Sequence, residues 1–210
     1  MAKEMDAKKT TNTYKRGQTI FYEGNSPFGI YCVFSGKIKL FKSSSNGKQV
    51  ILKILKAGDV MGYRSLFSSE PYAACAEVLD DAQVCFIPKD IFFKAITSDQ
   101  ATGWNVMKML SRELGMAETK VTDMVTKSAR MRMAELLLML KEAYGKKDKK
   151  GILIDLRLKR EELAEMTGIT QETAIRLVNE LKADGILHLE DHQIWVVSPE
   201  KLQELCELPY

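Results

Sequence analysis

Long apolar runs are absent from this chain of 210 residues. No stretch approaches the roughly 20 apolar residues that a membrane-spanning helix needs. The opening Met-Ala-Lys-Glu-Met-Asp also lacks the apolar core of a signal peptide. We therefore expect no membrane partner and predict a cytoplasmic protein.

Cysteine is scarce and scattered. The four cysteines, Cys32, Cys75, Cys85 and Cys206, form no Cys-x-x-Cys pair and have no spaced histidine set beside them. Metal and iron-sulfur centres usually require such clusters. We expect no metal site, and we interpret each cysteine as a small buried apolar residue in a reducing compartment.

The signatures of an enzyme are also missing. We find no nucleophile with a neighbouring base and no glycine-rich phosphate loop, because Gly24, Gly29 and Gly36 are better explained as β-turn residues. The net charge of +3 is too small to indicate nucleic-acid binding by itself. The sequence favours a binding protein over an enzyme.

Residues 14–98 have the pattern of a β domain. Glycines recur at regular spacing, and Ser45-Asn46-Gly47 is a hairpin signal. The strand candidates between these turns are residues 29–34, 38–41, 50–55 and 82–87. Turns at this spacing are typical of an antiparallel β sandwich or roll. We predict an antiparallel β-roll that follows a polar tail ending near Thr13.

The apolar period changes near Asp99 to that of a helix. Apolar residues then recur at steps of three and four, which is a heptad pattern. These residues are Met107, Leu110, Leu114, Ala117, Val121 and Met124. Because the other faces of the helix are polar, we expect this single apolar stripe to be buried against another surface. We predict a dimerisation helix over 99–127 with the stripe as the dimer interface; the alternative is a helix that packs on its own domain.

Residues 128–205 follow the order of a winged helix-turn-helix. An apolar-periodic helix ends in a charged segment, 145–151, which we expect to be an exposed loop. A short strand at 152–156, two short helices and a hairpin near 187–196 complete the pattern. His188 and His192 are interpreted as residues of this wing, since their spacing on a hairpin does not bring the two rings together.

Small residues lie where the two short helices would crowd each other. Ala164 allows the helices to approach, and Gly168 can take the positive φ of the turn. Thr170 is suited to cap the second helix. The residues expected in the shared core are Leu163, Ala174 and Leu177.

The second helix carries one polar face, because Glu172, Arg176 and Asn179 recur at i, i+4 and i+7. The alternative is a solvated face, in which an ion pair between Glu172 and Arg176 is worth only about 0.2–0.5 kcal/mol. Three neighbouring features favour a DNA-binding face over a solvated one. They are the basic start of the preceding helix, the wing that follows and the dimer helix upstream. Two-fold symmetry is what palindromic DNA requires.

With these residues in view, the chain from about Tyr14 to about Val197 resembles the CRP/FNR family of bacterial transcription regulators. The matching strings are Gly-Asp-Val-Met-Gly followed by Leu-Phe, then Ile-Pro-Lys, and Thr-Gln-Glu-Thr-Ala-Ile-Arg in the second short helix. The resemblance implies an α+β fold with an N-terminal antiparallel β-roll of the cyclic-nucleotide-binding kind, a long dimerisation helix and a C-terminal winged helix-turn-helix. It implies a homodimeric, sequence-specific transcription regulator.

The resemblance also implies a set of DNA-contacting residues. Family members use the positions of Glu172 and Arg176 to contact base edges, and those of Arg160 and Thr173 to hold phosphate. The chemistry agrees, since arginine offers two donors to guanine and glutamate accepts from the cytosine amino group. The predicted set is Arg160, Thr170, Gln171, Glu172, Thr173, Arg176 and Asn179. The partner is a palindromic promoter duplex, and an activator would also contact RNA polymerase.

Every polar anchor of the family's cyclic-AMP pocket is replaced. Tyr63 stands where the family has the glutamate that binds ribose, and Arg64 is displaced from the position of the family arginine. Tyr72-Ala73 replaces the pair that binds the cyclic phosphate, and Ala117-Glu118 replaces the pair on the dimer helix that binds the base. A buried phosphate without a guanidinium loses a strong charge-assisted contact. We expect no cofactor and no cyclic-AMP binding, and a degenerate pocket that leaves room for another small effector. The iron-sulfur branch is disfavoured because no cysteine precedes Cys32.

The alternative from another class is a ligand-sensing regulatory module that acts on a protein partner through its C-terminal helices. Steeply salt-dependent binding to a promoter duplex would distinguish the two, because only DNA releases condensed counterions.

Overall fold

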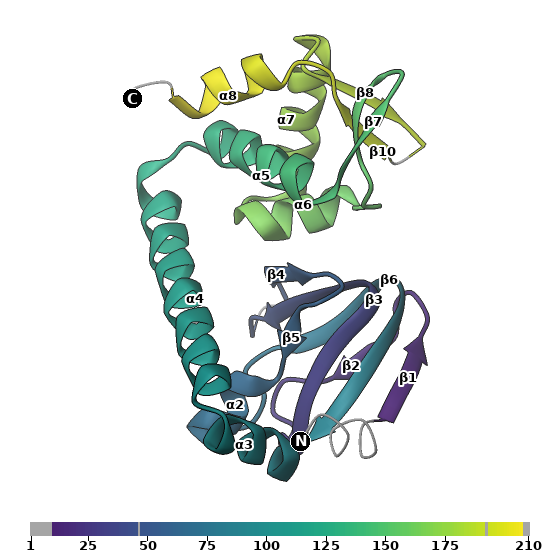
Figure 1. Cartoon of the computed structure of the whole chain (residues 1–210). Helices are drawn as coiled ribbons and strands as arrows, with labels where there is room; N and C mark the ends of the chain where they lie inside the picture. The colour runs from purple at the N-terminus through teal and green to yellow at the C-terminus, as the bar shows by residue number, and fades with distance from the viewer. Residues whose placement is uncertain (1–9, 46, 192, 208–210) are drawn as a thin grey trace. The chain divides into compact units, whose positions relative to one another are not determined.

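A computed structural model describes residues 10–45, 47–191 and 193–207. The chain divides into two compact units, one ending at Gly115 and the other beginning at Met116. The boundary lies inside the long helix α4 (Gln100–Thr126), so this helix contributes to both units (Figure 1).

The first unit is built on antiparallel strands that form the predicted β-roll. They are β1 (Thr10–Tyr14), β2 (Thr19–Phe21), β3 (Gly29–Ser43), β4 (Gln49–Leu55), β5 (Val60–Met61) and β6 (Cys75–Pro88). The strand order is β1-β6-β3-β4, while β2 pairs with β6 and β5 pairs with β3. The two long strands β3 and β6 therefore form the centre of the sheet (Figure 1).

Several strands differ from the prediction. Candidates 29–34 and 38–41 are one strand, β3, whose register with β6 is irregular around Ser35 and Lys37. Gly36 lies at this irregularity with φ of +87°, a conformation open to glycine. Residues 10–13, expected in the polar tail, belong to β1, which pairs with β6. Its side chains are mostly exposed, so no apolar alternation marks it in the sequence. The predicted turn at Asn46 lies outside the described residues.

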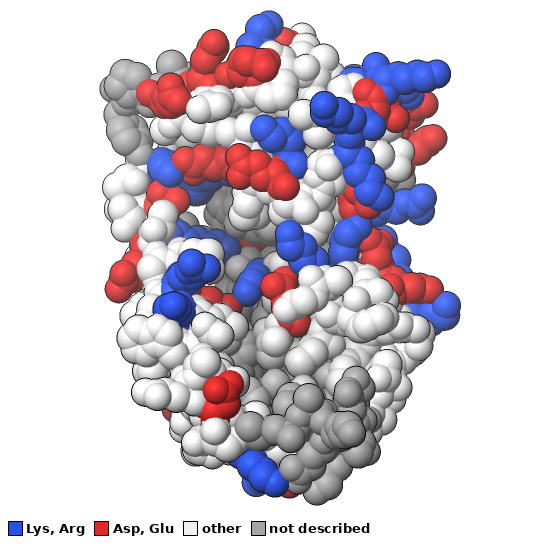
Figure 2. All heavy atoms as spheres, viewed as in Figure 1, with Lys and Arg blue, Asp and Glu red and all other residues white. Residues whose placement is uncertain are grey.

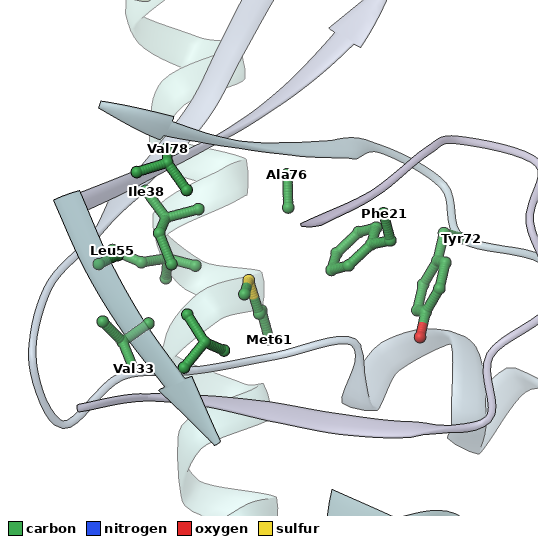
Figure 3. Packing of buried hydrophobic residues seen from close by; sticks show 10 residues of the cluster. Phe21, Val33, Ile38, Leu55, Met61, Tyr72, Ala76 and Val78 are labelled. Atoms are coloured by element: carbon green, nitrogen blue, oxygen red, sulfur yellow. The ribbon is translucent and has the colours of Figure 1, made fainter. Parts of the chain in front are cut away.

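Apolar side chains fill the interior of the β-roll (Figure 3). The labelled members of this cluster are Phe21, Val33, Ile38, Leu55, Met61, Tyr72, Ala76 and Val78. The rings of Phe21 and Tyr72 stack with their centroids 4.0 Å apart. Each large side chain buried here stabilises the fold by about 1.5–3 kcal/mol relative to an exposed one.

Helices pack against the roll through a second apolar cluster. The helices of the first unit are α2 (Tyr63–Ser68), α3 (Lys89–Ser98) and the start of α4. Buried members of the cluster are Ile30, Tyr63, Leu66, Ile87, Ile91 and Phe92, and Met109 and Leu110 of α4 pack against it. Neither α2 nor α3 was predicted from the sequence, because both are too short to show a clear period.

The second unit is a winged helix-turn-helix, as predicted. Its elements after α4 are α5 (Ala129–Tyr144), β7 (Gly145–Asp148), β8 (Gly151–Ile154), α6 (Arg160–Thr167), α7 (Gln171–Ala183), β9 (Leu187–Glu190), β10 (Gln193–Val196) and α8 (Pro199–Glu207). The sheet has the order β7-β8-β10-β9. Its core includes the fully buried Leu137, Leu140, Leu163, Leu181, Ile194 and Leu202.

The charged segment 145–151 is a hairpin rather than the predicted loop. Its first residues form β7, which pairs with β8 while all its side chains stay exposed. Figure 2 shows lysine and arginine side chains gathered where Figure 1 labels this hairpin. Pairing to β8 satisfies the backbone, so a charged sequence can still form an edge strand. His188 lies in the wing strand β9, as expected, whereas His192 lies outside the described residues.

Across the described ranges, no helix is long and apolar enough to cross a membrane, and no group of three or more His, Cys, Asp or Glu residues could hold a metal ion. All four cysteines are free and half-buried, not fully buried as expected.

Candidate nucleic-acid interface

A sharp turn joins α6 to α7. Gly168 ends α6 with φ of +68°, in the left-handed region, and its N–H donates to the Ala164 carbonyl. Ala164 is only 4% exposed, so its small side chain lies in the interior beside the turn. The predicted positive φ of Gly168 is confirmed. A side chain at Gly168 would strain the turn, because left-handed backbone is costly for most other residues.

Thr170 caps the start of α7. Its Oγ1 accepts a hydrogen bond of 3.2 Å from the N–H of Thr173, which satisfies one of the free donors in the first turn. One face of α7 is buried through Ala174, Leu177, Val178 and Leu181. The predicted core positions Leu163, Ala174 and Leu177 are thus confirmed.

The opposite face of α7 is open to solvent and carries the predicted reading residues. These are Gln171, Glu172, Arg176 and Asn179, all exposed, with Thr173 half-buried beside them. A capped helix with one side anchored and the other side uncovered and polar is suited to enter a DNA groove.

Arg176 is held in place by neighbours that the sequence analysis did not name. Its Nη1 lies 2.6 Å from Oε1 of Glu180, and Arg176 is 62% exposed. The other oxygen of Glu180 accepts from Arg130, 3.1 Å away. An exposed ion pair of this kind contributes only about 0.2–1 kcal/mol. Arg176 can therefore leave Glu180 for another acceptor at small cost.

Arg160 begins α6 with its side chain half-buried. Burial lowers the pKa of its guanidinium, but arginine is not deprotonated in proteins, so the charge persists. The preceding Lys159 N–H donates to Oε2 of Glu162 over 2.8 Å, as in the backbone half of a capping box. The charge of Arg160 thus adds to the positive end of the α6 dipole, where an anion is favoured.

Arg132 joins the end of α4 to the helix-turn-helix. Its Nε donates to the Thr167 carbonyl at 3.0 Å and its Nη1 to the Lys127 carbonyl at 2.7 Å. Met124 adds a second contact, since a Cβ placed on Gly168 would lie 3.4 Å from its Cε. Arg132 could not be predicted from the sequence, because its partners are backbone carbonyls and leave no mark in the residue pattern.

The apolar stripe of α4 is mostly uncovered in the single chain. In the first unit, Met107 is 53% and Leu114 is 62% exposed, whereas Leu110 is half-buried against the helix-facing cluster. Leu110 therefore follows the alternative of packing on its own domain. In the second unit, Ala117 is exposed, Val121 is 65% exposed and Met124 is 40% exposed.

The positions of the degenerate effector pocket are filled or turned outward. Tyr63 is 6% exposed and donates its hydroxyl hydrogen to Glu113 of α4, whose other oxygen lies 2.8 Å from Nζ of Lys53. Burial, followed by the Glu113 carboxylate, raises the pKa of Tyr63. Tyr72 is 5% exposed and stacks on Phe21 inside the roll (Figure 3).

The other predicted pocket residues are divided between the two units. Arg64 is exposed on α2, and Ala73 is half-buried just before β6. Ala117 and Glu118 are exposed on the part of α4 that belongs to the second unit. At the expected phosphate pair, Tyr72-Ala73 offers no basic side chain.

Two family models match the chain. One describes a cyclic nucleotide-binding domain and covers residues 11–99; the other describes a Crp-like helix-turn-helix domain and covers residues 131–205. The first model corresponds to the β-roll and its helices, and the second to the unit that contains α6 and α7.

Individual relatives are similar over nearly the whole chain. The anaerobic regulatory protein of Bacillus subtilis is 27% identical over 188 residues, which cover 89% of this chain and 79% of that protein. The cyclic AMP receptor protein of Thermus thermophilus is 26% identical over 193 residues, or 92% of this chain and 86% of that protein. The solved structure of FixK2 from Bradyrhizobium japonicum shares the fold, with a TM-score of 0.82 at 24% identity and coverage of 96% of this chain and 99% of that chain.

Proposed function

Because the chain belongs to the CRP/FNR family of bacterial transcription regulators, we propose that it acts as a homodimer that reads a palindromic promoter site with α7. It is a DNA-binding regulator and not an enzyme. The observation that carries the proposal is the uncovered polar face of α7, which is anchored from behind and capped by Thr170. Because it acts on bacterial DNA, we place its action in the cytoplasm.

The reading chemistry follows from the exposed side chains. Arg176 donates two hydrogen bonds to O6 and N7 of a guanine, and Glu172 accepts one from the amino group of a cytosine. Gln171 is suited to adenine, whose edge offers one donor and one acceptor. Arg160, Thr170 and Thr173 lie at helix starts, where phosphate contacts fix orientation without reading sequence.

The homodimer is supported by the exposed stripe of α4. Met107, Leu114 and Val121 are each more than half exposed, and a second copy of the helix would cover them at heptad spacing. Two helix-turn-helix units related by a dyad would meet half-sites about one helical turn apart. If the protein activates transcription, RNA polymerase is a further partner.

The β-roll is proposed not to take cyclic AMP, in contrast to what the name of the Thermus relative states for that protein. Tyr63 already bonds to Glu113, and Tyr72 occupies the roll interior against Phe21. A cyclic phosphate would have to displace both rings and would find no guanidinium in return. Calorimetry with cyclic AMP at micromolar concentrations is expected to show no heat of binding.

Selection of bound duplexes from a random-sequence library tests the central proposal. We expect a palindrome with a TGA-like core in each half-site, and affinity that falls steeply with salt because counterions are released. If no sequence is enriched, and the C-terminal unit captures a protein instead, the protein-partner alternative replaces this proposal.

A further inference from the structure

Two of the four cysteines lie directly opposite each other on neighbouring strands. Cys32 of β3 pairs with Cys85 of β6 in an antiparallel register. The register is regular on both sides, because Tyr31 pairs with Phe86 and Val33 pairs with Val84. Directly opposed side chains in an antiparallel sheet point to the same face, so the two thiols are neighbours.

The distances set by this register suit a disulfide. Opposed residues have Cα atoms roughly 4.5–5.5 Å apart, and disulfides are formed between Cα atoms about 4.4–6.8 Å apart. Cys75 has a different partner, since it lies opposite Phe41. It is also ten residues from Cys85 along β6, which places roughly 30 Å between them.

The pair lies at the edge of the apolar cluster under the helices of the first unit. Both cysteines are half-buried and pack against the cluster that contains Ile30 and Ile87, to which Met109 of α4 also packs. Because both side chains are partly exposed, a small oxidant can reach them. The regular strand pairing keeps the two cysteines directly opposite each other.

We propose that Cys32 and Cys85 are a reversible redox site that forms an intramolecular disulfide by exchange with a low-molecular-weight disulfide. One cysteine thiolate attacks the small disulfide and releases one small thiol, leaving a mixed disulfide. The second cysteine then attacks the protein sulfur of that bond and releases the second small thiol. Two protein thiols are thus oxidised while one small disulfide is reduced to two thiols.

Burial of Cys32 slows the formation of the disulfide but does not destabilise the disulfide once it has formed. Burial, followed by the nearby Cys85, raises the pKa of the Cys32 thiol to about 11. The reactive thiolate is therefore scarce at neutral pH, which lowers the rate. In strongly oxidising proteins, a thiolate of low pKa stabilises the reduced state and so makes the disulfide easy to reduce. Cys32 has a raised pKa, so its reduced state is not stabilised in this way. Once formed, the disulfide should persist until a reductant is supplied.

The chain offers matched controls for the test. Cys75 and Cys85 lie on the same tryptic peptide between Arg64 and Lys89, so the full-length Cys75→Ser/Cys206→Ser protein is used as the parent. It is incubated with oxidised glutathione, and its free thiols are then blocked for mass spectrometry. Cys32→Ser and Cys85→Ser are each made in the same background, and circular dichroism checks that every variant folds.

We expect the parent protein to lose two hydrogen atoms and to yield one linked peptide joining Cys32 to Cys85, which dithiothreitol separates. The two single-cysteine variants should show only a glutathione adduct or a free thiol. The proposal is overturned if the folded parent keeps both thiols free, stops at glutathione adducts, or links two chains on a non-reducing gel.

Discussion

Tyr63 of α2 donates its hydroxyl hydrogen to Glu113 of α4, and the same carboxylate pairs with Lys53 of β4. This tyrosine, predicted to stand at the family's ribose-binding position, thus ties α2 and the roll to the middle of α4. Its partner lies 50 residues away in the sequence. The connection joins three elements of the first unit and needs no bound ligand.

Removing this hydroxyl should destabilise the protein. Tyr63→Phe keeps the ring and deletes a hydrogen bond to a charged acceptor, so we expect the free energy of unfolding to fall by about 1.5–3 kcal/mol. Urea unfolding followed by circular dichroism measures the change. Tyr22→Phe is the control, since Tyr22 is 59% exposed and should tolerate the same deletion. Equal stability of the two variants would mean that the bond to Glu113 contributes nothing.

Arg176→Ala should weaken DNA binding in a base-dependent way. Loss of a bidentate contact to guanine should cost about 1–3 kcal/mol and relax the preference at that base pair alone. Competition binding against every single-base variant of the selected site measures this. Lys182→Ala removes the same charge from the last turn of α7 and should change affinity far less. A uniform loss across all variants would make Arg176 a backbone contact.

Arg160→Ala should act differently from Arg176→Ala. A phosphate contact carries no base information, so affinity should fall similarly on all sequences. The slope of log affinity against log salt should also become shallower by roughly one, because fewer counterions are released. Salt titrations on the selected site and on a scrambled duplex test both statements. An unchanged slope with altered base preference would contradict the assignment.

Charges placed on the α4 stripe should separate the dimer. Leu114→Glu combined with Val121→Glu would bury two unpaired carboxylates from each chain in the interface, each costing several kcal/mol. Sedimentation at micromolar concentration should show a dimer for the natural sequence and a monomer for this variant. Met116→Glu is the control, because Met116 is 58% exposed and lies off the stripe. A monomeric natural protein would disprove the interface.

The Cys32 thiol should react with iodoacetamide slowly at neutral pH and faster as the pH rises. Its folded pKa of about 11 means that its thiolate fraction increases roughly tenfold for each pH unit below that value. Peptide mapping after timed alkylation between pH 7 and pH 9 measures the rate. Urea-unfolded protein provides the comparison, since burial is lost there and labelling should be rapid. Similar rates in both states would show that burial does not protect this thiol.

The sequence predicted α7 in detail because its signals are local. A capping threonine, a turn glycine and an apolar period all lie within a few residues of one another, and Thr170, Gly168 and Leu177 are where these rules put them. The contacts that surround this helix depend on distant residues. Arg130 lies 50 residues from Glu180, and no periodic pattern marks such a pair.

Patterns failed where an element was short or its partner was ambiguous. β1 exposes nearly all its side chains, so it looked like a tail, and β7 looked like a loop for the same reason. The heptad pattern included Leu110 correctly as apolar but could not tell which surface would cover it. The structure shows that Leu110 packs against the β-roll, so its own domain covers part of this side chain.

The boundary at Gly115 has a consequence for how this protein could be recombined with others. Ala117, Val121 and Met124 belong to the same compact unit as α6 and α7, and Arg132 joins the residue after this helix, Lys127, to Thr167 at the end of α6. A hybrid joined at Ser128 would lose Met124, whose side chain lies beside Gly168 of the turn. A hybrid joined within α4 after Gly115 would transfer half of the apolar stripe together with α7. The suitable joint for grafting a new N-terminal domain onto this helix-turn-helix unit is therefore in the middle of a helix.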